Sequence, residues 1–402
     1  MNVLFLSPSW PPEMNGYVRG LASVGATVLG VGDGPRAGLP PTTDAALAAY
    51  LQVPRILDED DVIRRIEEAL PQVPDRVEAL WEPVMALAAR LRERWGLPGL
   101  DAARTHRFRD KPSMNAAVAA AGLATPAGGR ATSADEVRAL AARLGFPLIV
   151  KPVAGAGSAD TFRVHDAAAL EAVLPRLLHV PEVAVESFVT GPEYTYETLC
   201  VDGRPLLRSV CRYWPNTLEA RKKEWISPII HTYRSPPAEL AGGVALGDAV
   251  IDALEMGTGL THMEWFLSDG QAVFGEVACR PPGANMIDLM NYAGDIDLYE
   301  QWARAVVHGS PSVPDERPYS AAIVFKRAKG QGRIRRVEGL DRFVAKHGPW
   351  IARVDLLPIG APRRDWQATF LSDGNIVVRH PDDEVSLAMA MEAAATVHLY
   401  AG

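Results

Sequence analysis

Two glutamates in one short segment are the residues of this chain best suited to chemistry. Residues 261–283 read THMEWFLSDGQAVFGEVACRPPG, and the alternating apolar side chains on either side of Ser-Asp-Gly predict a β-hairpin. Glu264 and Glu276 occupy positions that a simple strand pair would fill with apolar residues or threonine. Two adjacent carboxylates repel each other unless a proton or a cation lies between them, so a hard divalent ion is their natural occupant.

Whether the two glutamates meet depends on the turn, because side chains alternate faces and a one-residue change of register reverses them. With a two-residue loop, Ser268 pairs with Gln271 and the carboxylates point to opposite faces. With a three-residue loop, Gly270 takes the left-handed position of a bulge and Leu267 pairs with Gln271. The carboxylates are then diagonal neighbours on one face, roughly 5 to 8 Å apart at Cβ. The other interpretation is a solvated strand face with two unrelated acids.

A second group of residues could bind phosphate. Phe146–Val150 predicts a buried strand, and Lys151 leads from it into a Gly-rich turn at residues 152–161. The backbone N–H groups of such a turn can surround phosphate oxygens, although a Gly-rich hairpin taken alone is more often an ordinary turn. It is not a Walker loop, because its lysine precedes the glycines. Since Mg²⁺ completes its shell with water and phosphate oxygens, the carboxylate pair points to a nucleotide.

Composition and charge exclude several classes of protein. The 402 residues exceed one ordinary core, and 48% hydrophobic with 22% charged residues is typical of a soluble globular protein. The net charge of -8 gives no broad basic surface for nucleic acid or anionic lipid. No apolar run reaches the ~18 residues of a membrane span, and the first residues predict a strand rather than a signal peptide. Cys200, Cys211 and Cys279 form no CxxC pair, so we expect buried thiols in a reducing cytoplasm.

The order of the predicted elements indicates a fold that mixes α/β and α+β parts. Residues 1–100 alternate strands and helices and predict a small parallel α/β domain. Residues from about 311 predict a closing α/β module. Between them, Lys111 stands at the start of a predicted helix, and Glu186 and Glu193 flank the short connection between two predicted strands.

Three further polar residues have two interpretations each. Lys222 and Lys223 lie in a loop that would be merely solvated on its own, but next to a nucleotide they would bind anions. Because His262 shares the face of Glu264 by parity, it either lines a site there or is a structural histidine bonded to a neighbouring carbonyl.

Taken together, these pieces resemble the ATP-grasp superfamily, in particular its carboxylate–amine ligases such as the L-amino acid ligases, and more distantly biotin carboxylase and D-alanyl-D-alanine ligase. The resemblance covers nearly the whole chain and depends on the order and spacing of several features rather than on one motif. It implies an N-terminal α/β domain at residues 1–100, a two-part ATP-grasp fold at 101–185 and 186–310, and a C-terminal α/β module at 311–402. It also implies that the Gly-rich turn is a mobile flap over the phosphates.

The resemblance implies a role for each candidate residue. Glu264 and Glu276 would hold Mg²⁺, or Mn²⁺ in its place, while the catalytic residues would be Lys151 at the phosphates and Arg280 at the reacting carboxyl group or its acyl phosphate. Residues 186–189 would hold the adenine through backbone groups, and Glu193 would bind the ribose. The residues implied for ATP are Lys111, Lys151, Gly155, Gly157, Ser158, Glu186, Ser187, Phe188, Val189 and Glu193. Those open to a substrate or phosphate role are Lys222, Lys223, His262 and Asn285.

One position departs from the pattern of this family. Two residues after the second metal glutamate the family usually carries Asn, and this chain has Ala278. Either Glu276 and phosphate oxygens hold a second Mg²⁺, or Asn285 supplies the missing ligand, or the site binds a single ion.

The implied reaction joins a carboxylic acid, in particular an amino acid, to an amine at the expense of ATP. The carboxylate attacks the γ-phosphate, and the amine then displaces phosphate from the acyl phosphate, so that ADP and phosphate are released. The alternatives are a carboxylase that activates bicarbonate and a nucleotide-binding regulator without turnover. The expected partners are small-molecule acids and amines, without nucleic acid or membrane, and a homodimer stays open because dimers are frequent among similar enzymes.

Overall fold

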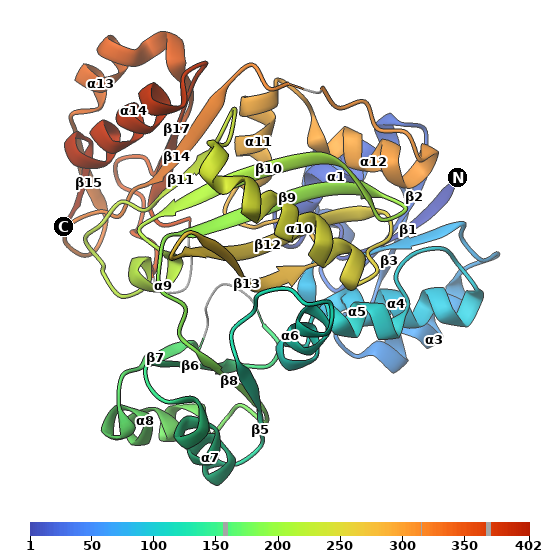
Figure 1. Cartoon of the computed structure of the whole chain (residues 1–402). Helices are drawn as coiled ribbons and strands as arrows, with labels where there is room; N and C mark the ends of the chain where they lie inside the picture. Colours follow the sequence, from blue (N-terminus) through green and yellow to red (C-terminus); the bar gives the residue numbers. More distant parts are fainter. Residues whose placement is uncertain (156–159, 315, 367–370) are drawn as a thin grey trace.

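The computed structural model describes residues 1–155, 160–314, 316–366 and 371–402 (Figure 1). The N-terminal part is a parallel sheet with the strand order β3-β2-β1-β4. Buried aliphatic side chains on its strands and helices form one core of their own. The strands are β1 (Asn2–Leu6), β2 (Thr27–Gly32), β3 (Leu47–Gln52) and β4 (Arg76–Glu78), and the helices are α1 (Met14–Ser23), α2 (Pro41–Ala46), α3 (Glu59–Ala69) and α4 (Met85–Trp95).

A small antiparallel sheet with the order β5-β8-β6-β7 follows, set apart from the rest of the chain in Figure 1. Ser133 begins its covering helix α7, because the Ser133 hydroxyl accepts a hydrogen bond from Glu136 N at 3.2 Å, and Gly145 ends it. Its elements are β5 (Gly128–Ala131), α7 (Ala134–Leu144), β6 (Leu148–Pro152), β7 (Phe162–Val164), α8 (Ala167–Val173) and β8 (Val183–Ser187).

A large antiparallel sheet occupies the centre of the molecule, with the order β13-β12-β9-β10-β11-β14-β17-β16. Strands from beyond residue 311 therefore continue the sheet that contains the hairpin, instead of forming a separate one. Its strands are β9 (Glu193–Val201), β10 (Arg204–Trp214), β11 (Ile229–Thr232), β12 (Gly259–Ser268), β13 (Gln271–Ala278), β14 (Ser320–Phe325), β16 (Ile351–Leu356) and β17 (Gly374–His380).

Helices surround the central sheet and connect it to the other parts. A two-stranded sheet, β15-β18, completes the C-terminal end. The remaining elements are α5 (Ala102–Arg107), α6 (Lys111–Ala120), α9 (Thr217–Ala220), α10 (Ala241–Ala253), α11 (Met286–Gly294), α12 (Leu298–His308), β15 (Ile334–Glu338), α13 (Leu340–His347), α14 (Asp383–Thr396) and β18 (His398–Ala401).

Helix α1 of the N-terminal part packs tightly on α12. A Cβ at Gly20 would lie 2.4 Å from the Tyr299 carbonyl oxygen, and one at Gly16 would lie 2.5 Å from the Tyr299 ring, so both positions require glycine. The ring of Tyr17 meets that of Trp302 edge-on at 5.2 Å. These contacts fix the N-terminal sheet against the central sheet.

The mixed α/β and α+β fold class is confirmed, while the boundaries at residues 100, 185 and 310 remain predictions. The three cysteines are free and buried. Across the described ranges, we find no helix with the length and apolar character needed to cross a membrane.

Candidate active site

Strands β12 and β13 form the predicted hairpin with a two-residue turn. Ser268 pairs with Gln271, and the turn residues Asp269 and Gly270 have φ values of 50° and 79°. The three-residue loop is therefore wrong. Both turn residues adopt left-handed conformations, which matches the twist of the strands.

The glutamates nevertheless share one face, because a bulge lies deeper in the hairpin. Trp265 pairs with Phe274, but Glu264 pairs directly with Glu276, so Gly275 is the extra residue. A Cβ at Gly275 would lie 2.8 Å from the Glu264 carbonyl oxygen. The bulge thus reverses the parity that the short turn would have imposed, and it requires a glycine.

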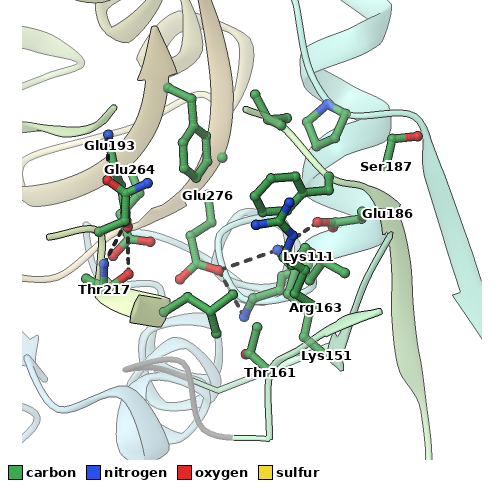
Figure 2. Close-up of a pocket in the computed structure, with 18 of the residues that line it drawn as sticks. Lys111, Lys151, Thr161, Arg163, Glu186, Ser187, Glu193, Thr217, Glu264 and Glu276 are labelled. Atoms are coloured by element: carbon green, nitrogen blue, oxygen red, sulfur yellow. Dashed lines mark hydrogen bonds and ion pairs between the residues drawn. The ribbon is translucent and has the colours of Figure 1, made fainter. Parts of the chain in front are cut away.

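A cavity of about 440 Å³ lies between the small sheet and this hairpin (Figure 2). Most of the predicted site residues line it: Lys111, Lys151, Gly155, Glu186, Ser187, Phe188, Val189, Glu193, Lys222, Glu264 and Glu276. Gly157 and Ser158 lie outside the described residues. Four other predicted residues are not part of the described lining: Lys223, His262, Arg280 and Asn285.

Two lysines converge on Glu276 (Figure 2). Lys111 Nζ lies 3.4 Å from Glu276 Oε2 and donates to the Gly155 carbonyl at 3.0 Å. Lys151 Nζ lies 2.8 Å from Glu186 Oε2 and 3.9 Å from Glu276 Oε2. Asp110 places Lys111 at the first position of α6, because its side chain accepts a hydrogen bond from Ser113 N and caps the helix.

These ion pairs keep the groups charged despite their burial. Burial acts to lower the pKa of Lys151, but the carboxylates of Glu186 and Glu276 outweigh it, and the pKa is raised. Burial acts to raise the pKa of Glu276, but Lys111 and Lys151 lower it. At neutral pH the cavity therefore presents the ammonium group of Lys151 beside the ionised carboxylate of Glu276.

Glu193 is a third carboxylate in this cavity. It accepts hydrogen bonds from Thr217 N at 2.8 Å and Thr217 Oγ1 at 2.7 Å. Burial, together with the nearby charge of Glu264, raises the pKa of Glu193 to about 8. The carboxylates on the central-sheet side of the cavity thus repel each other, which is the electrostatic condition for holding a cation.

The donor set fits a hard ion with few protein ligands. Within the described ranges, no group of three His, Cys, Asp or Glu side chains could hold a metal on its own. Glu264 and Glu276 could supply two carboxylate ligands, and phosphate and water would supply the rest, as is usual for Mg²⁺. Asn285 precedes α11 with φ 56° and is not among the lining residues described, and its role in place of the Asn missing at Ala278 stays a prediction.

His262 lies behind the cavity between two carboxylates. Its Nδ1 is 2.9 Å from Glu197 Oε1, and its Nε2 is 3.6 Å from Glu264 Oε1. Burial acts to lower the pKa of His262, but Glu197 and Glu264 raise it to about 10. Neither interpretation of this histidine is therefore correct, since it contacts carboxylates rather than the cavity or a carbonyl.

Arg280 lies at the junction with the N-terminal part. Its Nε is 3.0 Å from Glu82 Oε2, and Arg109 Nε is 2.9 Å from Glu82 Oε1. Glu82 thus bridges two arginines from different parts of the chain. The two predicted loop lysines have different surroundings. Lys222 lines the cavity, whereas Lys223 forms an ion pair with Glu219.

Residues at or near the site that the sequence interpretation missed include Glu82, Arg163, Glu197 and Thr217. Only Glu197 carried a usable signal, since it shares its parity with Glu193 on β9 and pairs in register with His262. The others reach the site through contacts between elements distant in the sequence.

Comparison with known proteins identifies the class. Residues 116–290 match the model of the ATP-grasp domain, so this part of the chain is similar to that domain. Curated relatives are 25 to 28% identical to it. An uncharacterized protein, y4rH, of Sinorhizobium fredii is 26% identical over 66% of this chain and 56% of its own length. A formate-dependent phosphoribosylglycinamide formyltransferase of Chlorobaculum tepidum is 28% identical over 75% and 82%. An L-arginine-specific L-amino acid ligase of Bacillus subtilis is 25% identical over 44% and 45%. The matched region therefore spans about half the length of two of these relatives.

Solved structures share the whole fold. The L-amino acid ligase from Bacillus licheniformis superposes with a TM-score of 0.78 at 20% identity, covering 100% of this chain and 99% of that chain. The biotin carboxylase domain of the Hydrogenobacter thermophilus 2-oxoglutarate carboxylase, solved with MgADP and bicarbonate, gives a TM-score of 0.69 at 15% identity, covering 99% and 91%.

Proposed function

We propose that this protein is an ATP- and Mg²⁺-dependent ligase that joins a carboxylic acid, in particular an amino acid, to an amine. The observation that carries the proposal is the convergence of Lys111 and Lys151 on Glu276, opposite Glu264, in a cavity between two sheets. This arrangement combines cations for phosphate oxygens with carboxylates for a divalent ion. The likeness in fold to an L-amino acid ligase supports the choice of substrates.

The chain's own residues would prepare the first step by neutralising charge. Lys111 and Lys151 would each exchange part of their contact with Glu276 for phosphate oxygens, where negative charge develops during transfer. A bound Mg²⁺ would supply further neutralisation on the same oxygens. Glu264 and Glu276 would hold it, and His262 would orient Glu264 from behind.

The second step requires exclusion of water, because water would hydrolyse an acyl phosphate. Lys111 already donates to the Gly155 carbonyl, at the edge of the predicted flap, and so links the phosphate site to that segment. Arg280 would face the carboxyl group of the acid, and its ion pair with Glu82 would hold it against the N-terminal part. Residues 186–189 would hold the adenine, and Glu193, fixed by Thr217, would bind the ribose.

The proposal is tested by the release of ADP and phosphate from ATP and Mg²⁺ over a panel of amino acids, supplied singly and in pairs. We expect release that requires both an acid and an amine, and that disappears in Glu276→Ala. Glu171→Ala, an exposed glutamate paired with Arg138 on the small sheet, serves as the matched control and should retain activity.

Two other outcomes would replace the proposal. Release that requires bicarbonate instead of an amino acid would indicate a carboxylase. Tight binding of ATP without release under any condition of the panel would indicate a nucleotide-binding regulator.

A further inference from the structure

One cation of the cavity has no acidic partner within the part of the chain that the structure describes. Arg163 lies on β7 and lines the cavity, and its guanidinium carbon is 3.8 Å from the centroid of the Phe188 ring. Its Nε is buried and has no hydrogen-bond partner. Figure 2 shows Arg163 in the group of side chains that surrounds the cavity, on the same side as Lys151 and Glu186.

Lys111 and Lys151, which also line this cavity, differ from Arg163 because each has an acidic partner. Lys111 and Lys151 each form an ion pair with Glu276, whereas no ion pair or hydrogen bond of the Arg163 guanidinium is found among the described residues. A guanidinium has five donors and no acceptor, and leaving buried donors unpaired is unfavourable. Stacking on Phe188 orients the guanidinium plane but satisfies none of these donors. A ligand that fills the cavity and excludes its water would have to supply acceptors for these donors.

The register of the small sheet places Arg163 away from the phosphate side of the cavity. Arg163 pairs with Ile149, and Ile149 pairs with Glu186, so these residues form one row across β7, β6 and β8. Lys151 is two residues further along β6, roughly 6 to 7 Å closer to the Gly-rich turn. Phe188 follows β8 directly, in the segment proposed to hold the base. Arg163 is thus on the base side of the cavity.

We propose that Arg163 is a nucleobase-binding residue, whose donors pair with acceptor atoms of the base while Phe188 holds the guanidinium in plane. This inference rests on the proposed function, because it assumes that the cavity takes a nucleoside triphosphate. A hydrogen bond from a charged donor to a ligand acceptor contributes enough to change affinity by about 10- to 100-fold.

The matched control is Arg176, which lies in the short helical turn after α8. Arg176 lies over the ring of Phe162, its guanidinium carbon 4.4 Å from the centroid, but Arg176 is exposed and outside the described lining of the cavity. Arg176→Met therefore removes an arginine–phenylalanine stack from the same small sheet without touching the cavity.

The test measures the binding of ATP and of tripolyphosphate, each with Mg²⁺, by calorimetry for the wild type, Arg163→Met, Arg163→Lys and Arg176→Met. We expect Arg163→Met to bind ATP about 10- to 100-fold more weakly and tripolyphosphate with unchanged affinity, while Arg176→Met matches the wild type. Arg163→Lys should fall between them for ATP, and thermal unfolding of each variant checks that it is folded.

Three results would contradict the inference. Unchanged ATP affinity in a folded Arg163→Met would exclude a contact with the nucleotide. An equal loss for ATP and tripolyphosphate would assign Arg163 to the phosphates instead of the base. A wild type that binds neither ligand would overturn the proposed function, and the inference with it, which distinguishes the two failures.

Discussion

Two lysines of this chain are buried and yet have opposite charge behaviour. Lys151 in the cavity and Lys326 in the C-terminal part are both penalised first by burial. The pKa of Lys151 is nevertheless raised, because Glu186 and Glu276 are its neighbours. The pKa of Lys326 is lowered by burial and by the charge of Lys329 to about 7.

The partners of the two ammonium groups explain the difference. Lys326 Nζ donates to the carbonyls of Ala393 and Ala394 at 3.1 and 3.0 Å, near the C-terminal end of α14. Carbonyl dipoles satisfy its donors but compensate its charge only in part. Carboxylates compensate the charge of Lys151 fully, so that it stays available for an anionic ligand. Burial alone therefore does not decide whether a lysine stays charged at neutral pH, because its partners also act on its pKa.

The largest expected effect separates the two lysines by activity. Lys151→Met removes a charge at the proposed phosphate site and should lower kcat/KM for ATP about 10³-fold. Lys326→Met should leave this parameter within about twofold, since Lys326 is not among the described lining residues of the cavity. Steady-state ADP release measures both, and an equal loss in the two variants would contradict the distinction.

The second largest expected effect is a pH dependence of the free energy of unfolding that is caused by Lys326. The folded-state pKa of Lys326, about 7, is below the ordinary lysine value of 10.5, so between these pH values the unfolded chain binds more protons than the folded chain. The free energy of unfolding should therefore rise with pH across this window. Relative to Lys326→Met, the free energy of unfolding of the wild type should increase by on the order of 3 kcal/mol between pH 7 and pH 10.

Urea unfolding at several pH values measures this difference. Lys346→Met, which removes an exposed lysine paired with Glu392, is the control and should show no such slope relative to the wild type. A constant difference between the wild type and Lys326→Met across the window would contradict the lowered pKa.

The positions of Glu264 and Glu276, the carboxylates beside Lys151, depend on the bulge at Gly275. Gly275→Ala places a Cβ against the Glu264 carbonyl and should shift the two carboxylates, raising the Mg²⁺ concentration needed for half-maximal ADP release about tenfold. Gly283→Ala is the control, because a Cβ there would meet no atom within 4 Å. Identical Mg²⁺ dependence in the two variants would mean that the bulge does not position the ligands.

The smallest effect distinguishes two adjacent lysines. Lys222 lines the cavity, whereas Lys223 pairs with Glu219 and has a side chain 59% exposed. Lys222→Ala should raise the KM for ATP or for the acid about 5- to 10-fold, and Lys223→Ala should change either value less than twofold. Equal effects would show that the cavity lining does not predict which loop lysine meets a ligand.

Local patterns made much of the site predictable. The apolar alternation of residues 261–283 predicted the hairpin, and the position of Lys151 before a Gly-rich turn predicted a cation beside that turn. Lys111 was placed at a helix start, which Asp110 caps. Such features depend on residues close in the sequence, and so the sequence contains enough information to find them.

The remaining features depend on contacts between distant segments. The bulge at Gly275 lies inside the hairpin, where register also has to match β9, so the turn alone could not decide it. Glu82 meets Arg280 from a segment nearly two hundred residues earlier in the chain. The continuation of the central sheet by β14, β17 and β16 likewise requires long-range strand pairing that periodicity does not encode.

The central claim is that the lysines and carboxylates of the cavity transfer the γ-phosphoryl group to a carboxylate. The most direct test uses an acid that supports ADP release, labelled with ¹⁸O in its carboxyl group, and follows the label by mass spectrometry of the released phosphate. The account predicts one ¹⁸O atom in each phosphate formed by the wild type, and no labelled phosphate from Glu276→Ala. Phosphate that carries no label, with both ¹⁸O atoms still in unreacted acid or with the displaced ¹⁸O recovered in AMP or water, would contradict it.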